Sequence, residues 1–253
     1  MKRTSISSWL PSLVVLLAVL GVWWLASHFS WVSKVFLPTP EAAWSSLRRG
    51  LSDGQLAGQT WQTVSRMLQG WLLACVGGIA LGALIGMSPG ARAWLQPFLE
   101  FLRPLPASAV MPLAISLFGL GPNMVLFVVA FGAMWPVLLA TLHGFATVEP
   151  RLREVAGALQ MPELEFVRKI GLPSAMPDVL AGMRLSLTVS LVVAVVGEMI
   201  ASQEGLGQAI LLAARSFHAD DLFAGIVLLG IVGFLANALL ATAEQRLLRW
   251  QRP

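Results

Sequence analysis

The sequence predicts an all-α membrane protein that crosses the bilayer six times. Only 12% of its 253 residues are charged and 57% are hydrophobic, whereas an average soluble domain is about 25% charged. Tryptophan occurs 10 times and tyrosine not at all, so tryptophan must supply the aromatic rings at the membrane interface. Six apolar runs are long enough to cross a hydrocarbon core, which takes about 20 residues of helix. They lie at residues 10–29, 64–87, 97–119, 123–146, 179–201 and 222–244.

The first run follows Lys2 and Arg3, as the apolar part of a signal peptide would. We favour an uncleaved anchor, because the stretch from Leu10 to Ala26 is long and the residues after it do not resemble a cleavage site. In the next segment, Pro40 and Glu41 mark the start of a short interfacial helix. The segment is too short for a separate outer domain. We therefore expect an N-terminal helix with an outer segment at 1–63, and a core of five spans at 64–253.

The second run contains a face of small residues. Gly78, Gly82 and Gly86 recur at four-residue spacing, which lets another helix backbone approach closely in lipid. The alternative is the general enrichment of glycine in membrane helices. The third run opens with Pro104, Pro106 and Pro112, which disturb the helical hydrogen bonds. This broken start favours a translocation bundle, although a cytoplasmic approach segment would explain it equally well.

Ionisable residues inside the spans are few. They are Arg66, His143, Arg184 and Glu198, and none lies at the middle of a span. We take Arg184 and Glu198 as candidates for a pathway or gate, because charges in membrane segments are costly and usually functional. A self-sufficient secondary carrier or channel for a small anion would need midplane charges or an internal repeat, and neither is evident.

Catalysis, metal binding and nucleic-acid binding are not indicated. His28, His143 and His218 fall on different segments, the single cysteine Cys75 lies in an apolar run, and no phosphate-binding glycine-lysine loop occurs. The net charge of +4 is dispersed over loops, without the basic patch that nucleic acid requires. We instead interpret the charge as topology, since Lys and Arg gather in cytoplasmic loops. Six crossings then place both termini and residues 147–178 in the cytoplasm.

The polar segment 147–178 interrupts the apolar runs. Its apolar residues Leu152, Val155, Ala156 and Leu159 recur at the spacing of one helical face. Pro162 suits the first turn of a second helix, where acidic residues at 163 and 165 favour the helix dipole. We expect helix, break, helix and then a stop at Leu172 and Pro173. A partner's groove is one place to bury the stripe.

The same segment resembles the cytoplasmic loop of binding-protein-dependent ABC importer permeases. That loop runs Glu-Ala-Ala, three residues, Gly, nine residues, Ile, one residue, Leu-Pro. Glu154, Ala156, Ile170, Leu172 and Pro173 match, Val155 replaces the first Ala, and Gln160 replaces the Gly. The phrases "FLPTPEAAW", "MPLAISLFGLGP", "LPSAMPDVLAGMRLSL" and "GEMIASQEGLGQAI" are similar to the nitrate, taurine and alkanesulfonate branch.

The resemblance implies a type I ABC importer transmembrane-domain fold (MetI-like) in a bacterial inner membrane, within the lipid bilayer. It implies partners: cytoplasmic ABC ATPase subunits that carry ATP and Mg, a periplasmic or lipoprotein solute-binding protein, and a second permease, either a copy of this chain or a sibling. This chain itself would bind no cofactor and catalyse no reaction. The implied solute is an organic sulfonate, taurine or nitrate.

The resemblance also implies roles for single residues. Glu154 would anchor the loop, Ala156 and Leu159 would pack into the ATPase groove, and Leu172 and Pro173 would join the loop rigidly to the fifth span. Gln160 would adopt a left-handed turn only at a cost that glycine avoids, so Pro162 is the alternative breaker. An assembly or scaffold protein would explain the glycines but would leave this loop without a role.

Overall fold

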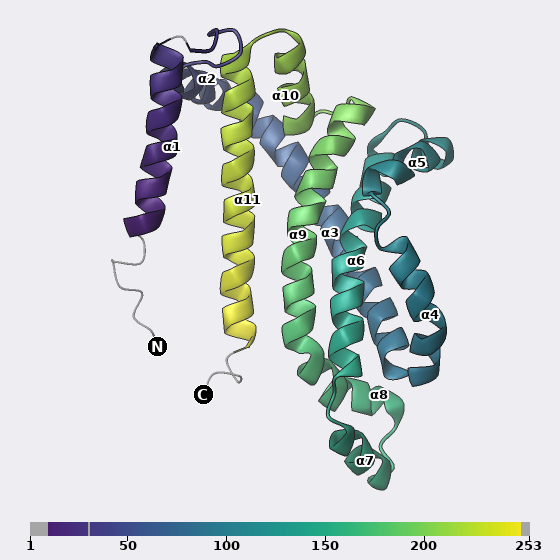
Figure 1. Ribbon diagram of the computed structural model, residues 1–253. Helices are drawn as coiled ribbons and strands as arrows, with labels where there is room; N and C mark the ends of the chain where they lie inside the picture. Colours follow the sequence, from purple (N-terminus) through teal and green to yellow (C-terminus); the bar gives the residue numbers. More distant parts are fainter. Residues whose placement is uncertain (1–9, 30, 249–253) are drawn as a thin grey trace.

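A computed structural model describes residues 10–29 and 31–248, and over those residues the protein is built from helices and connecting loops (Figure 1). The all-α class is therefore confirmed. Lys2 and Arg3, used above for topology, lie outside the described residues. The elements are α1 (Leu10–His28), α2 (Pro40–Ser52), α3 (Gln55–Met87), α4 (Pro89–Leu102), η2 (Ala107–Val110), α5 (Met111–Phe118), α6 (Pro122–Ala146), α7 (Pro150–Ala158), α8 (Glu163–Phe166), η3 (Val167–Gly171), α9 (Leu172–Ala201), α10 (Leu206–Arg215) and α11 (Ala219–Leu247).

Length and composition support four membrane spans among the described residues. These are α3, α6, α11 and the continuous helical stretch from Glu163 to Ala201. A fifth arises if α4 and the η2–α5 segment, which are bent by 89° at their junction, count as one span. The described apolar part of α1 is shorter than these helices. The prediction of six spans is thus confirmed only in part. The described residues form an all-helical protein with four or five candidate spans.

The apolar run at 97–119, whose start the prolines were expected to break, is divided between two bent segments. The chain forms α4, breaks after Leu102, and resumes as η2 and α5. Pro104 and Pro106 lie in the break, where their missing N–H groups cannot continue the helical hydrogen bonds. Gly132 of α6 accommodates the bent segment, since a Cβ there would lie 2.8 Å from the Cβ of Ala107.

The expected helix stop at Leu172 and Pro173 is also wrong. Helix α8 continues through the π-helical turn η3 into α9. Proline is tolerated in the first turn of a helix, where its missing donor leaves no bond unmade. A π-helical turn shifts the backbone pairing locally and absorbs such an irregularity. The second half of the 147–178 segment is therefore an extension of the fifth predicted span.

Helices α3, α6 and α9 form the core and make the most extensive contacts with one another. Buried methionine, valine and alanine side chains fill the space between them. Gly78, Gly82 and Gly86 all lie on the face of α3 against α6. A Cβ at Gly82 would lie 2.6 Å from the backbone oxygen of Leu138, so glycine is what permits this separation.

The molecule has two distinct ends (Figure 1). Helices α7 and α8 lie at one end, and the last turn of α11 points toward that end. At the opposite end lie α2, which begins as expected at Pro40, and α10. The short helix α10 is amphipathic. At this end Trp23 of α1 stacks on Phe223 of α11 with ring centroids 5.3 Å apart.

Candidate functional site

Helices α7 and α8 form a hairpin beyond the end of the three-helix core, which we call the α7–α8 hairpin (Figure 1). Its apolar residues divide between two faces. Ala156 is 5% exposed and faces the interior of the chain, whereas Leu159 is 69% and Leu164 81% exposed. Val155 is exposed as well. Ala156 therefore packs within this chain, and the surface open to a partner consists of Val155, Leu159 and Leu164.

The break between α7 and α8 is a left-handed turn at Gln160, whose φ is +49°. The amide of Gln160 donates to the carbonyl of Gly157 at 3.0 Å, and the amide of Met161 donates to the carbonyl of Ala156 at 2.9 Å. These two bonds are the pairing of a Schellman C-cap, a position usually occupied by glycine. Pro162 caps the following helix instead of making the turn. Gln160 thus keeps the shape that glycine favours, at a conformational cost.

Arg153 attaches the hairpin to the core, a role that the sequence did not indicate. Its guanidinium donates to the carbonyl of Met87 at 3.1 Å and to that of Phe145 at 3.5 Å. It also lies 5.5 Å from the ring centroid of Phe166. One side chain of α7 therefore contacts the ends of α3 and α6 and the helix α8. A cation at the carboxyl end of α3 is favoured by the helix dipole.

The other candidates of this segment are distributed between exposed and partly buried positions. Glu154 is exposed and forms no ion pair with another described residue. Pro173 is exposed in the first turn of α9, while Ile170 and Leu172 are partly buried. Leu172 packs against the cluster around Phe145 and Val179. The leucine-proline pair thus lies at the junction of the hairpin with the fifth span.

Glu198 is fully buried at the opposite end of the core. One carboxylate oxygen accepts from Arg66 Nη1 at 2.7 Å, and the other accepts from Thr63 Oγ1 and the backbone amide of Gly207, each at 2.9 Å. The Arg66 guanidinium also donates to the carbonyl of Glu204 at 2.6 Å. This network, which we call the Glu198 network, joins α3, α9 and the start of α10.

Arg184, the other gate candidate, pairs with Glu244 of α11 at 2.8 Å. It is exposed and lies on α9, in the half nearer the hairpin. Neither Arg184 nor Glu198 is among the described residues that line the larger cavities. Both side chains hold helices together in this structure.

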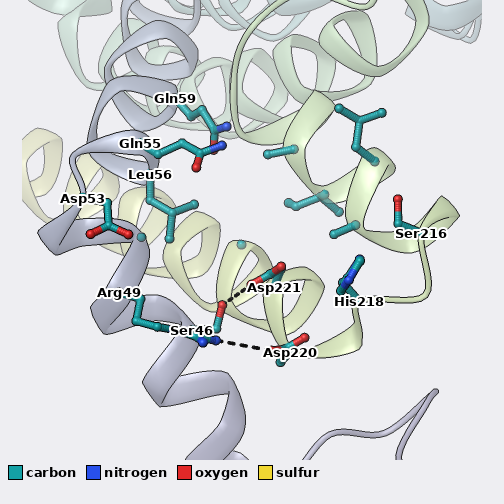
Figure 2. A pocket seen from close by; sticks show the side chains of 16 residues that line it. Ser46, Arg49, Asp53, Gln55, Leu56, Gln59, Ser216, His218, Asp220 and Asp221 are labelled. Atoms are coloured by element: carbon teal, nitrogen blue, oxygen red, sulfur yellow. Dashed lines mark hydrogen bonds and ion pairs between the residues drawn. The ribbon is translucent and has the colours of Figure 1, made fainter.

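A polar cavity of about 620 Å³ lies at the end opposite the hairpin, between α2, α3, α10 and α11 (Figure 2). Across it, Ser46 hydrogen bonds to Asp221, and Arg49 pairs with Asp220 at 3.5 Å. His218 lies at its edge. The described residues contain no group of three or more side chains placed to hold a metal ion. The acidic residues here mainly connect α2 to the start of α11.

A second cavity of about 460 Å³ lies between the bend after α4, the middle of α6 and the middle of α9. Arg103, Trp135 and Val189 are among its lining residues. The sequence placed Arg103 beside the prolines of the third run but assigned it no role. This cavity lies away from both the hairpin and the Glu198 network.

Comparison with known proteins identifies the family to which this chain belongs. Residues 78–250 match the model of the binding-protein-dependent transport system inner membrane component. The chain is 32% identical over 243 residues to the putative aliphatic sulfonates transport permease protein SsuC of Bacillus subtilis, covering 96% of this chain and 88% of that protein. The chain belongs to this family of ABC importer permeases, as its resemblance indicated. It is thus a multi-pass membrane subunit that transports a small solute and is not an enzyme.

Other relatives and one solved structure agree. The taurine transport system permease protein TauC of Escherichia coli is 29% identical, with 94% of this chain and 89% of that protein covered. The nitrate import permease protein NrtB of Leptolyngbya laminosa is 28% identical, with coverage of 94% and 87%. The inward-facing MetNI methionine ABC transporter superposes with a TM-score of 0.67 at 19% identity, covering 76% of this chain and 96% of that one. This last similarity supports the fold alone.

Proposed function

We propose that this chain forms the translocation pathway of an ATP-driven importer and that the α7–α8 hairpin couples it to a cytoplasmic ATPase subunit. The observation that carries the proposal is the exposed apolar surface of Val155, Leu159 and Leu164 on a hairpin that Arg153 attaches to the core. An apolar surface of this kind is stable when a partner's groove covers it. ATP and Mg would bind to that partner.

The hairpin has two mechanical connections to the spans. One is covalent, since α8 continues through η3 into α9 without a loop. The other is Arg153, which contacts the carboxyl ends of α3 and α6. A movement of the hairpin imposed by ATP binding would then reach all three core helices together. Glu154, exposed on α7, is available to anchor the hairpin to the ATPase.

The remaining architecture follows from this function. We infer six crossings in total, with α1 and the bent α4–α5 segment each crossing once, and both termini on the cytoplasmic side with the hairpin. The described ends of α1 and α11 lie toward the hairpin end of the molecule, which supports this topology (Figure 1). Residues 1–63 would add an anchor and outer segment to the core at 64–253. A second permease copy would complete the pathway as a homodimer, and a periplasmic or lipoprotein solute-binding protein would deliver the solute at the opposite end.

The proposed solute is an organic sulfonate, taurine or nitrate. This is supported by relatives that are named for the transport of aliphatic sulfonates, taurine and nitrate. All three solutes carry an oxyanion.

Two substitutions test the coupling role. Glu154→Lys and Pro173→Leu should leave membrane insertion intact, because both side chains are exposed, and should abolish uptake. The chain should copurify with an ATPase subunit. Lys169→Glu serves as a control, since Lys169 forms only an exposed pair with Glu165, and it should retain uptake. Unimpaired uptake in both variants would disprove the coupling assignment.

A further inference from the structure

The cavity between the bend after α4, α6 and α9 has the composition of a ligand site. Its lining includes Gly132 and Trp135 near the middle of α6, and Leu185 and Val189 near the middle of α9. Its volume of about 460 Å³ lies in the range of small-molecule sites, which are mostly apolar with a few polar groups. These residues lie near the middle of both helices, and the exposure of Leu185 (58%) and Leu105 (40%) shows that the cavity opens on the surface of the chain.

Arg103 is the charged residue among the described side chains that line this cavity. It forms no ion pair with a described acidic residue. Its side chain is exposed at the bend after α4, and a guanidinium at the level of the spans is costly unless an anion or a water-filled cavity receives it. Its planar array of donors also matches the geometry of an oxyanion. The electrostatics of the cavity therefore favour a negatively charged ligand.

The ring of Trp135 forms part of the same cavity wall. Its side chain is 8% exposed, and its indole N–H has no acceptor among the described residues. Buried donors are rarely left without a partner, because such a group costs free energy. The neighbouring Pro136 has no N–H, so the carbonyl of Gly132 lacks its helical donor. The buried indole N–H is not accessible from the cavity, so Trp135 contributes the surface of its ring to the wall, and Arg103 is the charged donor there.

The apolar remainder of the lining distinguishes between oxyanions. Leu105, Leu139, Leu185, Val189 and Val193 form much of the wall. An inorganic oxyanion such as nitrate has no apolar part to contact these side chains. Each CH₂ group buried there should instead strengthen binding about fourfold. The lining favours a solute that carries both an oxyanion and a short hydrocarbon chain.

We propose that this cavity binds a small organic oxyanion of the alkanesulfonate type, with Arg103 on the oxyanion and the leucine and valine wall on the hydrocarbon. The inference rests on the proposed function, since it names a solute site within the translocation pathway. The competing role for Arg103 is extension toward a lipid phosphate, as long basic side chains often do at membrane boundaries.

Equilibrium binding of radiolabelled ethanesulfonate to the full chain in nanodiscs tests the site directly. Arg103→Gln should weaken binding about 10- to 100-fold, as expected for the loss of a charge-assisted hydrogen bond. Arg92→Gln, on helix α4 and outside the cavity, should bind as the unmodified chain does. Nitrate should bind about 10-fold more weakly than ethanesulfonate.

Three results would overturn the inference: equal binding by the unmodified chain and Arg103→Gln, no binding at millimolar ethanesulfonate, or nitrate binding as tight as ethanesulfonate. Loss of binding in proportion to added anionic lipid would assign Arg103 to lipid headgroups instead. Copurification with an ATPase subunit is measured on the same preparations. Arg103-dependent binding by a chain that does not copurify with an ATPase subunit would support the solute site and contradict the importer role. Copurification with the ATPase but no Arg103-dependent binding would support the importer role and contradict the solute site.

Discussion

The carboxylate of Glu198 on α9 accepts a hydrogen bond from Arg66 on α3 at 2.7 Å, in an ion pair whose acidic partner is fully buried. The second carboxylate oxygen is used by Thr63 and by the amide of Gly207. A buried ion pair is stable only when its geometry is good and its remaining hydrogen-bonding capacity is satisfied. The Glu198 network meets both conditions and fixes α10 against the core.

Removing the cation should therefore be costly. Arg66→Ala leaves the Glu198 carboxylate buried without its charge partner, so we expect a loss of about 3–5 kcal/mol in the free energy of unfolding. The measurement is denaturant unfolding in detergent. Arg49→Ala removes an exposed pair with Asp220 and should cost about 1 kcal/mol or less. Equal losses in the two variants would show that the buried network adds nothing.

The glycine face of α3 offers a matched comparison. A Cβ at Gly82 would lie 2.6 Å from the carbonyl of Leu138 and 2.7 Å from Thr141 Cβ, whereas at Gly77 it would meet only Met134 Sδ at 3.6 Å. Gly82→Ala should lower the unfolding free energy by about 1–3 kcal/mol through overpacking. Gly77→Ala should be neutral or slightly stabilising, as alanine is in helices. Thermal unfolding of both variants checks this; a neutral Gly82→Ala would contradict the close packing.

Replacing Gln160 by glycine should stabilise the turn between α7 and α8. Because its φ is +49°, Gln160→Gly should relieve about 1 kcal/mol of strain. Gln160→Val should have the opposite effect, since β-branched residues tolerate this conformation poorly. Hydrogen exchange of the amides of Gln160 and Met161, which close the turn, is the measurement. Faster exchange in Gln160→Gly than in the unmodified chain would argue against the strain.

Much of the fold could be predicted because hydrophobic runs in lipid have few structural options. The spans around α3, α6, α9 and α11 were found from length and hydropathy. The sequence left the break between α7 and α8 open between a left-handed turn at Gln160 and an interruption at Pro162, and the structure has the turn at Gln160. Breaks were predicted less well: prolines at 104 and 106 indicated a disturbance, but not an 89° bend.

The site contacts depended on tertiary placement that the sequence does not contain. Arg66 and Glu198 were both noted as charges inside spans, yet nothing local indicated that residues 132 positions apart would pair. Arg153 stood beside the recognised motif, but its bonds depend on where α3 and α6 end. The stop predicted at Pro173 failed because a π-helical turn preceded it, a feature without a clear sequence pattern.

The most direct test of the coupling role is photocrosslinking from the hairpin in native membranes. Leu159 would be replaced by benzoylphenylalanine, with Leu212 on α10 as a control that is also exposed but lies at the opposite end of the molecule. We predict a crosslinked product from position 159 that contains an ABC ATPase subunit, and no such product from position 212. A crosslink to the ATPase from position 212 but not from position 159 would contradict the proposal that the α7–α8 hairpin contacts the ATPase.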